Sequence, residues 1–125
     1  RPAVPHLVAL LEKPEQVPQV RIIEALGRIG DASVAPQLLP FLKKGALQLR
    51  AEVATTMERF RYQDSAPMIE EAIPRKFEQG DAYYVYAILL ALTELDPTRG
   101  KEAIKQYLNE PAMEHVKNLL EPLLR

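Results

Sequence analysis

Side chains that carry out chemistry in proteins are scarce in this sequence. It has no cysteine, which removes thiolate nucleophiles and zinc–cysteine sites together. Its two histidines, His6 and His115, stand near opposite ends, too far apart in a row of helices to share a metal ion. Glu70 and Glu71 are adjacent, but neighbouring helical residues point about 100° apart, so we expect them on a solvated face. We therefore predict no catalytic site, no metal site and no cofactor, and expect that the protein is not an enzyme.

The glycines and the basic pairs also favour structural roles. Gly27 and Gly30 fall inside and at the end of a predicted helix, with no preceding strand and no Lys-Ser/Thr, so they form no phosphate loop. Lys43–Lys44 and Arg75–Lys76 are predicted near the ends of helices, where cations interact favourably with the helix dipole.

An internal repeat predicts the elements that position these residues. The segment AVPHLVALL, Ala3 to Leu11, recurs as VAPQLLPFL, Val34 to Leu42, and Ala66–Pro67 begins a third copy in the same register. A second alignment places Ala25–Leu26 on Ala91–Leu92. A period slightly above 30 residues is typical of stacked helix pairs.

Apolar residues at helical spacing predict about eight helices. Their approximate ranges are 3–12, 18–30, 34–44, 47–61, 65–78, 82–95, 98–109 and 112–121. Four aspartates are placed to cap helix starts, namely Asp31, Asp64, Asp81 and Asp96. Three glycines stand at predicted helix ends, where a left-handed residue is easiest to place, namely Gly30, Gly45 and Gly80.

The residues from Ile22 to Asp31, IIEALGRIGD, followed by Val34-Ala35-Pro36, resemble the short HEAT-like repeat of phycobilisome lyases and many bacterial and archaeal proteins. The resemblance implies an all-α fold, a right-handed α-α superhelix (solenoid) of stacked antiparallel helix pairs. It also implies long exposed faces that mostly bind other macromolecules. The sequence departs from the pattern where Gln19 and Val85 replace the arginine seen at Arg50. It departs again where Thr93–Glu94 replaces Gly27–Arg28.

A single domain is predicted over residues 1–125. It comprises a partial repeat at 3–13, repeats at 15–46, 47–80 and 81–110, and a terminal helix at 111–125. Apolar residues mark both ends, namely Leu7, Leu10 and Leu11 at one and Leu119, Leu120, Leu123 and Leu124 at the other. A solenoid normally ends in a polar cap, so we expect either a longer parent protein or end-to-end self-association.

Composition narrows the class of partner. The formal net charge is -1. In the predicted helix pairs, the outward positions of the second helix of each pair form no basic stripe. Nucleic acid and anionic membranes are therefore not favoured as partners. No apolar run approaches the roughly 20 residues that span a bilayer. The cytoplasm is only a default location. We predict a noncatalytic protein–protein interaction scaffold; the alternatives are a nucleic-acid-binding HEAT-like domain or an accessory part of a lyase or chaperone-type enzyme.

The strongest anomaly on the predicted surface is aromatic. Tyr83, Tyr86 and Leu90 follow each other at helical spacing, and the counterpart of Leu90 in the first full repeat is Glu24. We predict that these three residues, with Tyr84, form part of a partner-binding patch, because aromatic anchors often do so. The alternative that they pack between repeats or against another domain stays open.

Overall fold

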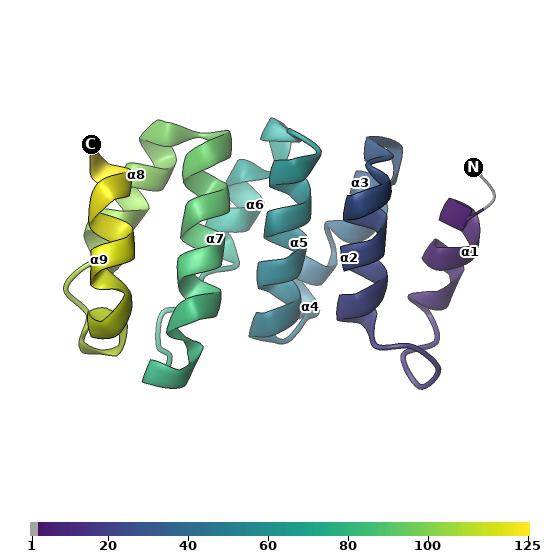
Figure 1. The fold of residues 1–125 in the computed structure, drawn as a ribbon, viewed down its shortest axis with the longest axis horizontal. Helices are drawn as coiled ribbons and strands as arrows, with labels where there is room; N and C mark the ends of the chain where they lie inside the picture. Colours follow the sequence, from purple (N-terminus) through teal and green to yellow (C-terminus); the bar gives the residue numbers. More distant parts are fainter. Residues whose placement is uncertain (1–2) are drawn as a thin grey trace.

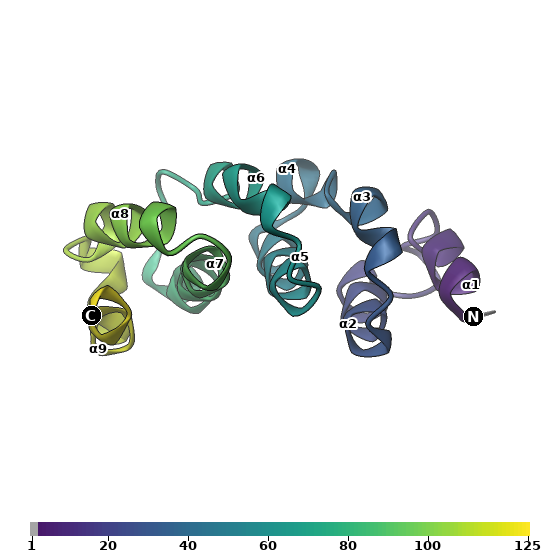
Figure 2. The same cartoon turned by 90° about the horizontal axis from the view of Figure 1, so that it is seen from above.

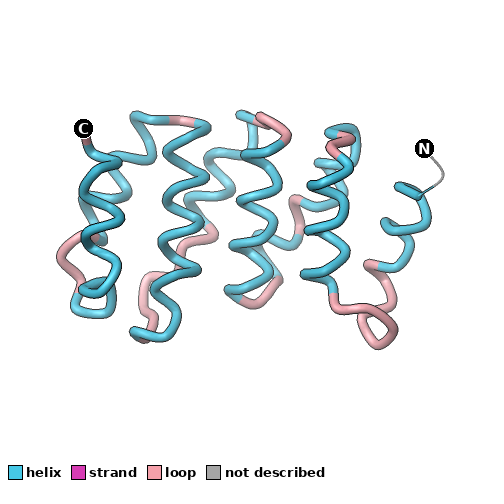
Figure 3. The backbone as a smooth tube through the Cα atoms, in the orientation of Figure 1, coloured by secondary structure: helices cyan, strands magenta, loops and turns pink. Residues whose placement is uncertain are grey.

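The structure, a computed structural model, describes residues 3–125 and contains only helices, turns and loops over that range (Figures 1 and 3). The α-helices are α1 (Ala3–Leu10), α2 (Gln19–Ile29), α3 (Ala35–Leu38), α4 (Phe41–Lys44), α5 (Leu47–Arg59), α6 (Ala66–Glu71), α7 (Ala82–Leu95), α8 (Pro97–Tyr107) and α9 (Lys117–Leu120). Five 3-10 helices accompany them: η1 (Ala32–Val34), η2 (Gln63–Ser65), η3 (Gln79–Asp81), η4 (Pro111–Val116) and η5 (Glu121–Leu124). The predicted all-α solenoid is confirmed.

The helices form two rows. α2, α5, α7 and α9 stand side by side nearest the viewer in Figure 1, and we call them the front row. Behind them lie α3, α4, α6 and α8, the back row. Seen from above, the rows follow a shallow arch with the front row on its inner side (Figure 2). α5 packs against α2 on one side and α7 on the other, so each helix contacts mainly its neighbours.

The core lies between the rows and is built from the apolar stripes that the sequence pattern predicts. Front-row helices supply residues such as Ile23, Met57 and Ile88, and the back row supplies Leu38 and Ile69, all fully buried. Burying one side chain of this size stabilises a fold by roughly 1.5–3 kcal/mol. The regular spacing of these residues therefore holds successive pairs in one stack.

Prolines shorten two of the predicted helices. The segment 34–44 is divided at Pro40 into α3 and α4, because proline lacks a backbone N–H and crowds the preceding turn. The prediction of a helix over 65–78 is wrong beyond Glu71, since Pro74 disfavours helical geometry in the residue before it. Arg75–Lys76 accordingly lies in a loop, whereas Lys43–Lys44 occupies the last turn of α4 as predicted.

The predicted aspartate caps are confirmed in part. Asp31 and Asp96 each accept a hydrogen bond of 3.1 Å from a first-turn backbone N–H. Asp81 instead accepts the backbone N–H of Glu78, at 3.2 Å, as the far partner in a reciprocal capping box that begins η3. The prediction for Asp64 is wrong, because its side chain caps neither η2 nor α6.

Two residues in the described range have a positive φ, and they stand at equivalent places in successive repeats. Gly30 ends α2 with φ 81°, as predicted. Arg61 follows α5 with φ 57°, a conformation that costs a residue with a side chain about 1–2 kcal/mol. The left-handed prediction is wrong for Gly45, with φ -83°, and for Gly80, since neither has a positive φ. Gly45 is needed for space, because a Cβ there would lie 2.7 Å from the carbonyl oxygen of Phe41.

The side chain of Arg50, in the first turn of α5, forms hydrogen bonds to the C-terminal ends of α4 and α6. Arg50 donates from Nε to the carbonyl oxygen of Gly45 at 2.7 Å and from Nη1 to that of Ala72 at 3.3 Å. Its Nη2 donates a third hydrogen bond, of 2.9 Å, to the carbonyl oxygen of Lys43 in the last turn of α4. Gln19, at the equivalent place in α2, keeps one such bond, from Nε2 to the carbonyl oxygen of Leu11 at 2.9 Å.

Glycine also sets how closely α7 and α8 approach. Gly100 is buried, and a Cβ there would lie 2.7 Å from the backbone nitrogen of Thr93. Thr93, which departs from the family pattern, therefore faces a glycine of α8. None of the helices in residues 3–125 combines the length and the apolar character that a membrane crossing requires.

Candidate protein-interaction surface

The outward side of α7 is the apolar part of the front row. Residues 82–93 contain no charged side chain. Val85, Ile88 and Leu92 point into the core and are fully buried. A helix that is apolar on all sides is normally buried on all sides, yet the outward side of α7 is only partly covered. Among the large hydrophobic side chains of residues 3–125, Tyr83 is the one that is exposed, at 61%.

The four predicted site residues lie on this helix but differ in exposure. Tyr83 is exposed, whereas Tyr84, Tyr86 and Leu90 are half-buried. The rings of Tyr83 and Tyr86 meet edge to face, with centroids 6.5 Å apart and an interplanar angle of 88°, which is a favoured aromatic geometry. These two tyrosines therefore form one continuous patch.

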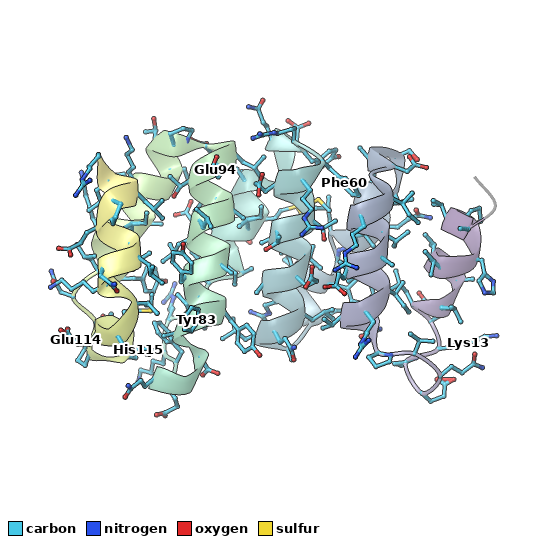
Figure 4. The ribbon with its side chains drawn as sticks, in the orientation of Figure 1. Lys13, Phe60, Tyr83, Glu94, Glu114 and His115 are labelled. Carbon is cyan, nitrogen blue, oxygen red and sulfur yellow. The ribbon has the colours of Figure 1, made fainter. Side chains whose placement is uncertain are left out.

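His115 joins this patch from a distant part of the sequence. Its ring lies edge to face with Tyr83, with centroids 6.2 Å apart, and Figure 4 shows both near the same end of α7. The sequence predicted only that His115 lies far from His6. The contact arises because η3, just before α7, packs against η4, which holds His115, and no local spacing signals that approach.

Tyr84 faces the other way, toward α5. It lines a shallow groove of about 180 Å³ between α5 and α7, together with Gln48, Ala51, Glu52, Thr55 and Ala87. The four predicted residues therefore share the outward side of α7, but Tyr84 lies on its flank toward α5 and Tyr83 lies on the flank toward His115. We use the term α7 surface for Tyr83, Tyr84, Tyr86, Ala87 and Leu90.

The equivalent positions in the other two repeats are polar only in part. In the repeat alignment, Leu90 corresponds to Thr55 in α5 and to Glu24 in α2. Tyr83 corresponds to Gln48 in α5 but to Val17 just before α2, and both counterparts of Tyr86 are apolar. Leu90 is therefore the position that is apolar in α7 alone, and Tyr83 and Tyr86 differ from their apolar counterparts by being aromatic.

Acidic and basic side chains lie close to one another on α2 and α5. Arg28 Nη2 lies 3.6 Å from Glu24 Oε2, and both side chains are well exposed, so the pair contributes little stability. Partial burial raises the pKa of the Glu52 carboxyl above its usual 4.5, and the nearby carboxylate of Glu24 raises it further. Arg59 and Arg28 act in the opposite direction.

Acidic side chains stand at both ends of the α7 surface. Glu94, near the upper end of α7 in Figure 4, is exposed, whereas Glu114 lies at the far edge of the molecule, beyond His115 and away from α7. Glu78 and Asp81 precede α7 at its lower end. Carboxylates therefore stand beyond both ends of the α7 surface.

The other residues considered for chemistry do not come together. His6 is exposed in α1, at the opposite end of the rows from His115. Over residues 3–125 no three His, Cys, Asp or Glu side chains cluster as metal ligands would. Glu70 was expected on a solvated face, but it is half-buried and binds Arg99 of α8 at 2.8 Å; only Glu71 is exposed as predicted. That bond raises the pKa of Arg99.

Comparison with known proteins places these observations in a family. The model of the HEAT repeats matches residues 4–79. Neither the curated proteins nor the solved structures yielded a match. HEAT repeats are generally protein-interaction scaffolds and are typically noncatalytic. Because the matched residues make up more than half of the chain, this protein belongs to the HEAT repeat family.

Proposed function

We propose that this chain is a noncatalytic interaction module that binds another protein through the α7 surface. The observation that carries the proposal is the exposed ring of Tyr83, placed where the equivalent residue of α5 is Gln48. Large aromatic side chains supply much contact area with few rotatable bonds, and they are common among the residues that dominate binding energy.

Packing within the repeat explains some of the apolar residues but not all of them. Tyr84 and Tyr86 pack partly against the core, so each has a structural role as well as an exposed edge. Tyr83 is outside that set, and its contacts are the edges of Tyr86 and His115. Burial of its ring by a partner is the explanation that we favour, and Tyr83 is the residue to test.

Site-specific photo-crosslinking tests the proposal. A photoreactive phenylalanine analogue replaces Tyr83, and the full chain is exposed to an extract of its source and illuminated. We expect a discrete protein adduct, because a partner seated on α7 lies within reach of this position. The matched control places the same analogue at Gln106, which is exposed on α8 in the back row.

Comparison of the two positions decides the outcome. Adduct formation at position 83, absent at 106 and reduced by unlabelled wild-type chain, is the expected result. Adducts of equal yield at both positions, or at 106 alone, would contradict binding through the α7 surface. Circular dichroism of both labelled chains checks that each remains helical.

A narrower proposal concerns the subtype of repeat. The segment from Ile22 to Asp31 resembles repeats of phycobilisome lyases, so we propose, as a narrower form of the function, that the chain is an accessory part of a lyase and holds a bilin for a client protein. The absorbance spectrum of a free bilin, recorded with and without the chain, tests this idea. A shifted and intensified band is expected, and an unchanged spectrum would overturn it.

End-to-end association is a separate proposal about the partner. Leu11 and Leu120 are buried within the chain, but Leu7, Leu10, Leu119, Leu123 and Leu124 are only half-buried. Contact between two ends would cover the half-buried set. Sedimentation velocity should show mass above the 14.1 kDa of one chain at high concentration. The substitution Leu123→Glu should abolish that increase, and a wild-type chain that stays monomeric throughout contradicts the proposal.

A further inference from the structure

The charges around the α7 surface indicate what kind of partner fits it. Along α7, the distance from Tyr83 to Glu94 is about 16 Å at the helical rise of ~1.5 Å per residue. The helix side between them is uncharged, and carboxylates stand at both of its ends: Glu94 at one, and Glu78 and Asp81, just before α7, at the other.

The flank toward α5 adds a further carboxylate. Glu52 lines the groove beside Tyr84, where a partner side chain of matching charge would meet it. The bases on this flank are Arg59 and Arg28, which both already interact with Glu52, and on the other flank the ring of His115 lies against Tyr83. The preference for a partner of opposite charge therefore rests on the carboxylates at the two ends of α7.

We propose that the α7 surface binds a short segment of another protein, with central apolar side chains and Lys or Arg on either side of them. This inference rests on the proposed function and adds the chemistry of the partner. The apolar residues cover Tyr83 and its neighbours, and the cations lie against the carboxylates at the two ends. Complementary charge of this kind fixes the position of the partner and speeds its encounter with the surface.

The same charges argue against two other occupants. A second copy of the chain, laid on the α7 surface in either direction, brings Glu94 against Glu94 or against the acidic end formed by Glu78 and Asp81. Like charges in contact are unfavourable. Nucleic acid is disfavoured for the same reason, because its phosphates would meet the carboxylates.

Synthetic peptides of matched design test this inference with the full chain. The chain has no tryptophan, so one tryptophan in a peptide reports binding through its own fluorescence. The first peptide is a helix former about 15 residues long, with Leu and Trp on one face and two Arg at each end, which is enough to span ~16 Å. The second replaces every Arg by Glu, and the third keeps Arg but replaces the Leu residues by Ser.

The expected order of affinity follows from the proposal. The Arg-ended apolar peptide should bind at least ten times more tightly than either of the others, and its affinity should fall as salt is raised. The variant Glu94→Gln should weaken this peptide several-fold, and Tyr83→Ser should do so as well. Glu71→Gln, an exposed carboxylate on the back row, is the matched control and should bind as wild type does.

The remaining outcomes separate the inference from the proposed function. Equal binding of the Arg-ended and Glu-ended peptides, both weakened by Tyr83→Ser, would overturn the basic partner and leave the α7 surface in place. Peptide binding that ignores Tyr83→Ser would overturn both proposals. A labelled single-stranded oligonucleotide that binds more tightly than the Arg-ended peptide would overturn the inference in favour of nucleic acid.

Discussion

At the scale of single residues, Glu52 links burial to pH dependence. Its pKa is raised chiefly by burial and further by Glu24, so the folded state holds this proton more tightly than the unfolded state does. Stability is therefore lost as the pH rises above 4.5 through the raised pKa of the folded state, and the cost is fully present at neutral pH.

Replacement of Glu52 by glutamine should remove this cost. We expect Glu52→Gln to raise Tm at pH 7 and to leave it unchanged near pH 4, where the wild-type carboxyl is protonated. The gain should stay below about 1 kcal/mol, because solvent screens a partly exposed group. Thermal melts at both pH values, with Glu71→Gln as the control, measure it; a lower Tm for Glu52→Gln at pH 7 would contradict the sign.

The two left-handed residues give a second prediction at this scale. Arg61→Gly should stabilise the fold by about 0.5–1 kcal/mol, because relief of backbone strain exceeds the greater flexibility of glycine in the unfolded chain. Gly30→Ala should cost about 1 kcal/mol from the backbone alone, since no atom lies within 4 Å of the added Cβ. Urea unfolding measures both. Destabilisation by Arg61→Gly would show that its side chain contributes more than the strain costs.

At the scale of the elements, Arg50 is the clearest tie between successive repeats. Arg50→Ala leaves three carbonyl groups without their donor, so we expect a loss of about 3 kcal/mol. Gln19→Ala removes one bond and should cost about 1 kcal/mol. Urea unfolding provides the comparison, and equal losses for the two variants would contradict the bond count.

The existence of the helices can be predicted from the sequence, whereas some of their ends cannot. Apolar periodicity predicts where the helical segments of the rows lie, because each must bury one stripe, but it does not predict the break between α3 and α4. It does not predict where α6 ends: Pro74 stops the helix, and Val85 offers no side-chain donor at the place that Arg50 occupies in α5. Nor does spacing predict that Arg61 takes the left-handed place of Gly30, since arginine shows no intrinsic preference for it.

The candidate site is predictable along the helix but not across the fold. The spacing of Tyr83, Tyr86 and Leu90 predicts that they share one side of α7, and the structure places them there. His115 could not be found in this way, because its contact with Tyr83 depends on how η3 and η4 pack. The divergence of Tyr84 from Tyr83 is predictable, because adjacent helical residues point about 100° apart, but that it faces α5 follows from the stacking of the helices.

At the scale of the whole molecule, stacking predicts a gradient of local stability. α5 is packed between α2 and α7, whereas α1 has neighbours on fewer sides and buries only Val4 within its own length. Local opening is easiest where few contacts must break. Amide hydrogen exchange should therefore be slowest in α5 and α7 and fastest in α1. Exchange at a uniform rate throughout the chain would show that it unfolds as one cooperative unit.

The central claim is that the front of α7 is where this HEAT repeat protein meets another protein. The most direct measurement is the dissociation constant of the partner captured by crosslinking, determined for wild type, Tyr83→Ser and the back-row control Gln106→Ala. We predict at least tenfold weaker binding for Tyr83→Ser, equivalent to about 1.4 kcal/mol, and unchanged binding for Gln106→Ala. Wild-type affinity in a correctly folded Tyr83→Ser chain would contradict the claim.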